Sequence, residues 1–211
     1  MKPGDFLLGV FEVFAILLPG GLATWLAIQY IPRSALNDAL TFGPGPPDPD
    51  GLVLGTAFVV AAYTLGHFVF MAGSKLDGSY DRWRKRVKPE SRDATYKAAK
   101  RLHESLNKDL ADGDFSTLKW AKAYIQIRAQ PARAEIDRLE ADQKFFRSLV
   151  VIAAAFAAHF LFREAAPAAG VACIVMGLLA YKRYVEQRWK MSELIYATAV
   201  MVHTTSAVPA P

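Results

Sequence analysis

The chain has 211 residues, of which 53% are apolar, and its formal net charge is +5. Its mean hydropathy of +0.15 is high for a soluble domain of this length. The apolar residues are clustered rather than periodic, which is typical of membrane-spanning segments. A single cysteine, Cys173, excludes a disulfide framework or a cysteine-based metal site within one chain. The composition therefore predicts an all-α membrane protein.

Two apolar runs near the N-terminus predict the first two transmembrane helices, Phe6 to Tyr30 and Leu52 to Met71. Each is long enough to cross a hydrocarbon layer of about 30 Å. The first run contains Glu12 and is too long for the core of a signal peptide, so we interpret it as a retained helix. Residues 33–50 between them are rich in Pro, Gly and Asp, which favours an irregular loop.

The runs Phe146 to Phe162 and Pro167 to Tyr181 predict a transmembrane helical hairpin. The chain would then contain four transmembrane helices, with a small helical cytosolic domain inserted between the second and the third. We divide it into 1–72 (helices one and two), 73–145 (basic helical cytosolic region), 146–181 (the hairpin) and 182–211 (a cytosolic C-terminal helix and tail). Lys and Arg are concentrated in 73–145 and after Tyr181, which favours cytoplasmic termini.

Within the polar region, a helical pattern begins at Asp93, and Ser116 can cap a second helix. From Ala132 the pattern continues without a stop signal to about Phe162, which predicts one long helix. Met191 to Val202 is apolar but too short to span a membrane. We therefore expect it to pack against the cytosolic helices.

Glu12 is a carboxylate about two turns inside an apolar helix, where a charge costs about 2.5–3.5 kcal/mol on insertion scales. His67 in helix two and Arg147 at the start of helix three should lie at a similar depth. We predict a Glu12–His67 or Glu12–Arg147 pair. It could act as a proton- or ion-sensitive gate, or it could be a polar contact that holds the helices together.

Pro19, Gly20 and Gly21 fall near the middle of the first apolar run. Proline removes a backbone hydrogen bond and glycine resists bending little, so a kink is expected there. The kink could serve as a hinge, or it could let the helices pack closely.

A basic cluster with interleaved aromatic residues follows helix two. Its cations are Arg82, Arg84, Lys85, Arg86 and Lys88. Near a membrane surface such cations attract anionic lipid at about 1 kcal/mol each. We predict that the cluster binds lipid and sets topology, with an acidic partner or a nucleotide as the alternative, and we expect no genomic nucleic acid.

Motifs of catalysis and of cofactor binding are missing from the sequence. The pair His103–Glu104 lacks the second histidine of a zinc-protease motif. We expect it to lie on the solvent-exposed face of a helix. Asp48 and Asp50 have the composition of an ordinary turn. We expect no enzyme activity, no cofactor and no metal site. We expect His159 to lie at the outer membrane–water interface or to form a packing contact between helices.

The block RLEADQKFFRSL, residues Arg138 to Leu149, leads directly into a membrane helix. It resembles segments of uncharacterised bacterial multipass inner-membrane proteins with four helices. The resemblance implies a location in the bacterial inner membrane and carries no catalytic residues with it.

These features favour a non-enzymatic inner-membrane module that forms homo-oligomers and contacts membrane lipids. Its cytosolic part would receive a protein partner or a small ligand, and its membrane helices would respond as a sensor or a pore-type effector. Small bacterial proteins of this architecture often resemble sensors or pore-type effectors of stress or phage-defence systems, so by analogy we expect such a role. Two alternatives stay open: a scaffold that anchors a cytosolic partner, and a proton-coupled transporter or membrane-enzyme subunit that uses Glu12 and His67.

Overall fold

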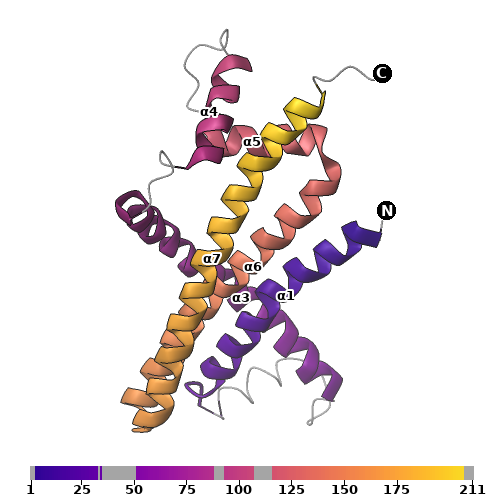
Figure 1. The fold of residues 1–211 in the computed structure, drawn as a ribbon. Helices are drawn as coiled ribbons and strands as arrows, with labels where there is room; N and C mark the ends of the chain where they lie inside the picture. Colours follow the sequence, from indigo (N-terminus) through magenta and orange to yellow (C-terminus); the bar gives the residue numbers. More distant parts are fainter. Residues whose placement is uncertain (1–2, 33, 35–50, 88–92, 107–115, 207–211) are drawn as a thin grey trace. The chain divides into compact units, whose positions relative to one another are not determined.

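All regular elements in the described part of the chain are α-helices (Figure 1). The structure, a computed structural model, describes residues 3–32, 34, 51–87, 93–106 and 116–206, and within these it leaves out the side chains of 3–12, 14, 130, 131 and 206. The helices are α1 (Pro3–Ile28), α3 (Gly51–Val87), α4 (Ala94–Leu106), α5 (Thr117–Arg128), α6 (Gln130–Phe162) and α7 (Pro167–Ser206). The expected all-α class is confirmed for these residues.

Three of these helices, α3, α6 and α7, are long and apolar enough to cross a membrane. The helix α1 has 26 residues, but the apolar part whose side chains are described, Ala15–Ile28, is shorter than a span. The membrane character of the chain thus rests on three helices, and the fourth span stays a prediction.

The long helices extend further than the apolar runs that predicted them. The helix α3 continues from the apolar run through the basic cluster to Val87, and Arg84, Lys85 and Arg86 occupy its last turn. Cations are favourable there because they interact with the partial negative charge of a helix C-terminus. The predicted rod from Ala132 to Phe162 is present within α6, which begins at Gln130 with proline in its first turn.

The chain divides into two compact units. Unit 1 comprises residues 1–8, 77–143 and 184–211, and unit 2 comprises residues 9–76 and 144–183. The helices α3, α6 and α7 each contribute residues to both units. The region 77–143 therefore groups with the C-terminal stretch.

Unit 2 is held together by close approaches at small residues. A Cβ atom at Gly20 of α1 would lie 1.8 Å from the carbonyl oxygen of Ala62 in α3, and one at Gly66 would lie 2.4 Å from that of Ile16. On the other pair of helices, a Cβ atom at Gly177 of α7 would lie 3.3 Å from that of Ala153. Small residues allow helix backbones to come this close, as is usual in membrane proteins.

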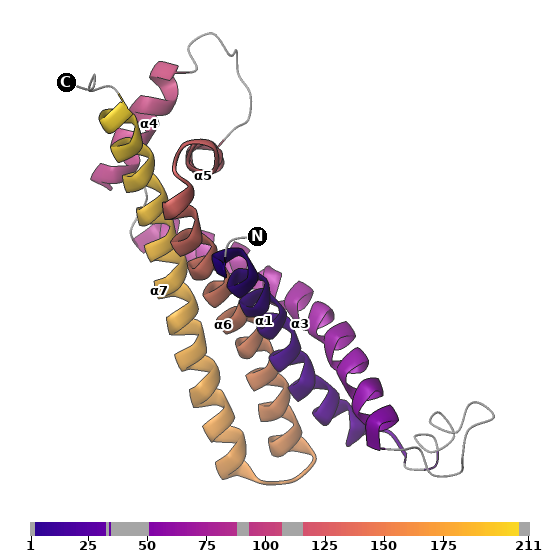
Figure 2. The ribbon, with the colours of Figure 1, turned by 90° about the vertical axis from the view of Figure 1, so that its right-hand side faces the viewer.

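The turn between α6 and α7 is short, and the two helices run side by side up to it (Figure 2). The amide of Arg163 donates to the carbonyl of His159 at 2.9 Å, and the amide of Ala166 to that of Phe160 at 2.9 Å. Between them, Ala165 has a φ of 49°, in the left-handed region that favours glycine. The turn thus satisfies carbonyls of the last turn of α6 at the cost of one strained residue.

Unit 1 has an apolar core built from four helices. Its buried residues are Ala99, Ala121, Ile125, Ile136, Ile195, Tyr196 and Ala199. They come from α4, α5, the beginning of α6 and the end of α7. The stretch from Met191 to Val202 packs against α4 and α5 here, as its length and apolar pattern predicted.

The predicted cap of α5 is also present. Ser116 is its N-cap residue, and the Ser116 hydroxyl accepts from the amide of Lys119 at 3.4 Å.

Candidate functional site

Of the residues predicted to form the intramembrane polar site, Arg147 of α6 is buried in unit 2 and His67 of α3 is exposed. The Arg147 side chain is 5% exposed, and its guanidinium carbon lies 4.6 Å from the centre of the Phe70 ring on α3. His67 is exposed, and its ring packs edge-on against Tyr63 at 4.7 Å. Glu12 lies in α1, and its side chain is outside the described part of the chain. The Glu12–His67 pair and the Glu12–Arg147 pair thus both remain predictions.

The space for Arg147 is created by Gly73 of α3. A Cβ atom at Gly73 would lie 3.1 Å from Cγ of Arg147 and 3.4 Å from its carbonyl oxygen. The guanidinium of Arg147 thus lies over the Phe70 ring, and the first part of its side chain lies against Gly73. A buried guanidinium gains from such an aromatic face because the ring carries negative charge above its plane.

The predicted hinge lies at a close crossing of α1 and α3 in unit 2. Pro19 is fully buried, and α1 continues as a helix through Pro19, Gly20 and Gly21. Thr24 donates its hydroxyl to the Gly20 carbonyl at 2.9 Å. This arrangement accounts for the glycines through packing, and a hinge movement remains a prediction.

A second polar cluster of unit 2 gathers around His159, which is 4% exposed. Its Nδ1 atom lies 2.9 Å from the Tyr30 hydroxyl, and its Nε2 atom lies 3.7 Å from a Glu164 oxygen. Arg163 places its guanidinium carbon 4.4 Å from the centre of the Tyr30 ring. This cluster ties the end of α1 to the turn after α6. His159 was expected at the interface or in packing, but its partners were not identified from the sequence.

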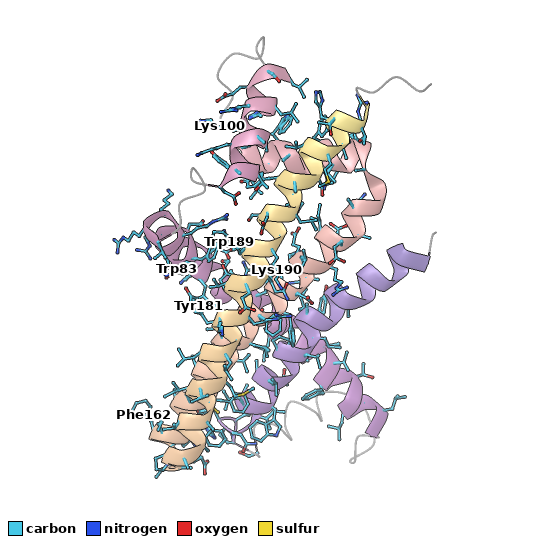
Figure 3. All side chains as sticks on the ribbon, viewed as in Figure 1. Trp83, Lys100, Phe162, Tyr181, Trp189 and Lys190 are labelled. Carbon is cyan, nitrogen blue, oxygen red and sulfur yellow. The ribbon has the colours of Figure 1, made fainter. Side chains whose placement is uncertain are left out.

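The predicted lipid-binding cluster is not uniform in its exposure. Arg82, Lys85 and Arg86 are exposed, and Lys88 lies outside the described residues. Arg84 is only 7% exposed, with its guanidinium carbon 4.6 Å from the centre of the Trp189 ring of α7. Figure 3 labels Trp189 on α7. The exposed cations remain suited to anionic headgroups, whereas Arg84 packs inside unit 1.

A polar network joins α3 to α7 within unit 1, and sequence analysis did not single it out. Tyr184 donates its hydroxyl to Asp77 at 2.6 Å. Arg188 pairs with the same Asp77 carboxylate and places Nη2 2.9 Å from Asp81. Arg188 also lies over the Tyr80 ring, 4.7 Å from its centre. We call these five residues the clasp.

The clasp holds its charges in partial burial, where ion pairs are screened less than on a surface. Tyr80 and Tyr184 are fully buried. Tyr184 lies beyond the apolar run that ends at Tyr181. Its burial, and next its hydrogen bond to the Asp77 carboxylate, raise the pKa of the Tyr184 hydroxyl, so it stays protonated and donates.

The described residues contain no group of three or more His, Cys, Asp or Glu side chains that could hold a metal ion. Cys173 is partly buried in α7. Asp48 and Asp50 lie outside the described residues. A search of known protein families, of characterised proteins and of solved structures finds no match to this chain. Its function must therefore be argued from its own residues.

Proposed function

We propose that the chain is a non-enzymatic module of the bacterial inner membrane, with both termini in the cytoplasm. Unit 1 receives a cytosolic partner or ligand, and unit 2 responds within the membrane as a sensor or pore-type effector built from several copies of the chain. Exposed cations near the end of α3 hold unit 1 close to anionic lipid. A role in stress or phage defence is consistent with this architecture by analogy.

The observation that carries the proposal is that α3, α6 and α7 each contribute residues to both units without a break in the helix. A helix of this length has no internal joint except where its hydrogen-bond ladder is interrupted. We propose that a change in packing in one unit reaches the other through these shared helices. Allosteric coupling needs elements of this kind, shared by two sites.

The clasp supports the same proposal because it connects two of the shared helices. Asp77 and Tyr184 are the first residues of α3 and α7 that belong to unit 1. Their hydrogen bond, with Arg188 beside it, sets the spacing of the two helices at that level. A ligand or partner that changes this spacing would act on both helices together.

The proposal is tested by ion flux into liposomes that contain the purified protein. We expect wild type to conduct ions, and Glu12→Gln to change the flux about tenfold or more, because it removes a charge at membrane depth. Glu193→Gln, at an exposed position of α7 in unit 1, serves as the control and should conduct as wild type does.

The mass of the protein in mild detergent provides the second arm of the test. A closed oligomer supports a pore-type effector. A monomer without flux in any condition contradicts it, and a monomer with a bound cytosolic protein supports a scaffold in its place.

A further inference from the structure

The polar side chains of unit 2 lie on different sides of its helices. On α6, Arg147, Ser148 and His159 are each 5% exposed or less. On α3, which is apolar enough to cross a membrane, Tyr63 is 48% exposed and His67 is also exposed. Polar residues within a membrane normally face protein or water. The outer face of α3 is thus unlike a face that only lipid covers.

Four exposed polar residues form a line along α3. Thr56, Tyr63, His67 and Ser74 are spaced by seven, four and seven residues, which places them on one face of a helix. We call these four residues the α3 stripe. Tyr63 lies near the middle of the apolar run from Leu52 to Met71, so the stripe is not confined to one end of the predicted span.

The opposite face of α3 is occupied by other helices of unit 2. Ala62 and Gly66 lie against α1, and a Cβ atom at Gly66 would lie 2.4 Å from the carbonyl oxygen of Ile16. Gly73 lies against Arg147 of α6. Among the described residues, these contacts leave the α3 stripe on the outside of unit 2.

The exposed face of α7 in the same unit has a different composition. Between residues 168 and 180, every exposed residue of α7 is apolar. Met176 and Leu178 are 63% and 64% exposed. Such a face suits lipid, because the hydrocarbon is as apolar as leucine. Two exposed helix faces of unit 2 are therefore chemically distinct.

The four residues of the α3 stripe differ in how their polar groups are satisfied. The hydroxyls of Thr56 and Ser74 donate to carbonyls of their own helix, at 2.8 and 2.6 Å. Tyr63 and His67 instead pack edge-on against each other, with ring centres 4.7 Å apart, and both stay exposed. A phenol and an imidazole that face lipid lose the hydrogen bonds that water gives them, which is costly. These two rings therefore favour water over lipid tails.

We propose that the α3 stripe faces water in the assembled protein and lines the path of hydrated inorganic ions. One helix does not enclose a path, so the stripes of several copies of the chain must surround it, while the apolar face of α7 meets lipid. This inference rests on the proposed function. It deepens that function by naming the residues of the membrane helices that the ions pass.

Exposure to water is measured by the reaction of single cysteines with a membrane-impermeant, positively charged methanethiosulfonate in liposomes. Cys173 is the single cysteine of the chain, so Cys173→Ala provides a background without a thiol. Thiols react as thiolates, and a charged thiolate forms in water but not among lipid tails. The test variants on this background are Tyr63→Cys and His67→Cys.

Two control variants share the exposure of the test positions but not the stripe. Phe68→Cys changes the residue next to His67, which is 57% exposed, and Leu178→Cys lies on the apolar face of α7. We expect both test variants to react at least about tenfold faster than both controls, because the thiolate forms only where water is present. The added cation should also lower the flux of cations in the test variants and not in the controls. Melting curves check that all four variants fold.

Equal reaction rates of Tyr63→Cys and Phe68→Cys would overturn the proposal, since the stripe would then face lipid. Fast reaction of His67→Cys alone would overturn it too, because His67 lies near the end of the apolar run, where reagent arrives from the membrane surface. Fast reaction of both test variants without any change in flux would refute the ion path.

The reaction is measured independently of flux, so the two proposals fail separately. If wild type conducts and the stripe does not react, the ion path lies elsewhere and the proposed function stands. If the stripe reacts and wild type does not conduct, the water-facing stripe stands and the ion path falls together with the pore-type effector.

Discussion

The two units differ in the side chains that form their helix contacts. In unit 1 the core includes large side chains such as Ile125 and Ile195, each 1% exposed. In unit 2 many large apolar side chains lie outside, as Leu178 does at 64% exposed and Phe58 at 40%, and small residues such as Gly20 and Gly66 lie at close helix contacts. The helices of the two units are thus packed through different kinds of side chain.

Exposed apolar side chains on the long helices of unit 2 fit helices that are apolar enough to cross a membrane. In water, burial of apolar surface stabilises a fold by about 25 cal/mol per Å². In lipid this driving force is lost, because the hydrocarbon is as apolar as leucine. Close backbone contact, dispersion and a few polar contacts must hold the helices together instead. Unit 2 contains contacts of these kinds. The helices α1 and α3 approach closely at Gly20, the Arg147 guanidinium lies over the Phe70 ring, and His159 is hydrogen-bonded to Tyr30.

The largest effect is expected at the crossing of α1 and α3. In Gly20→Val even the first added carbon would lie 1.8 Å from the Ala62 carbonyl oxygen, so the two helices must separate. Overpacking costs about 1–3 kcal/mol where side chains can adjust, and more where the backbone blocks the new atoms. We expect the variant to lose the folded state in detergent, measured by size-exclusion chromatography and thermal melting.

The matched control for this crossing is Gly55→Val on α3. Among the described residues, no atom apart from the adjoining backbone of α3 lies within 4 Å of a Cβ atom at Gly55. Its melting temperature should stay close to that of wild type. Equal stability of the two variants would contradict the close approach of α1 and α3.

The next effect concerns the core of unit 1 and uses two isoleucines of the same helix. Ile125 is 1% exposed and Ile127 is 79% exposed. Ile125→Ala removes buried atoms and leaves a cavity, which should cost about 3 kcal/mol. Ile127→Ala should change stability by less than about 0.5 kcal/mol. Hydrogen exchange of the α5 amides measures both, and equal protection in the two variants would show that α5 is not packed on this core.

Much of this arrangement follows from local patterns. Clustered apolar residues predicted the all-α membrane class, and a hydroxyl residue before an apolar stripe predicted the start of α5 at Ser116. The uninterrupted pattern from Ala132 predicted the length of α6. In each of these cases the signal lies within a few turns of chain, where propensity, capping and periodicity act.

The contacts of the candidate sites could not be predicted in the same way. His159 and Tyr30 are 129 residues apart in the sequence, and neither has a neighbour that marks it as a partner of the other. Arg84 lies among exposed cations of the same type, and only the position of α7 shows that it is the buried one. No sequence motif marks Asp77. Such contacts depend on which faces of distant helices meet, and a single sequence does not contain that information in any short pattern.

The smallest effect is expected in the turn of unit 2, and its sign is opposite to the others. Ala165 has a φ of 49°, where a side chain costs roughly 1 kcal/mol relative to glycine. Ala165→Gly should therefore raise the stability of the hairpin by up to about 1 kcal/mol, seen as a higher melting temperature in detergent. Ala166→Gly, next to it in the turn but without a positive φ, should have the opposite effect, because it adds only freedom to the unfolded chain. If both glycines lowered the melting temperature, the left-handed conformation of Ala165 would be refuted. The short turn would then need another way to satisfy the last carbonyls of α6.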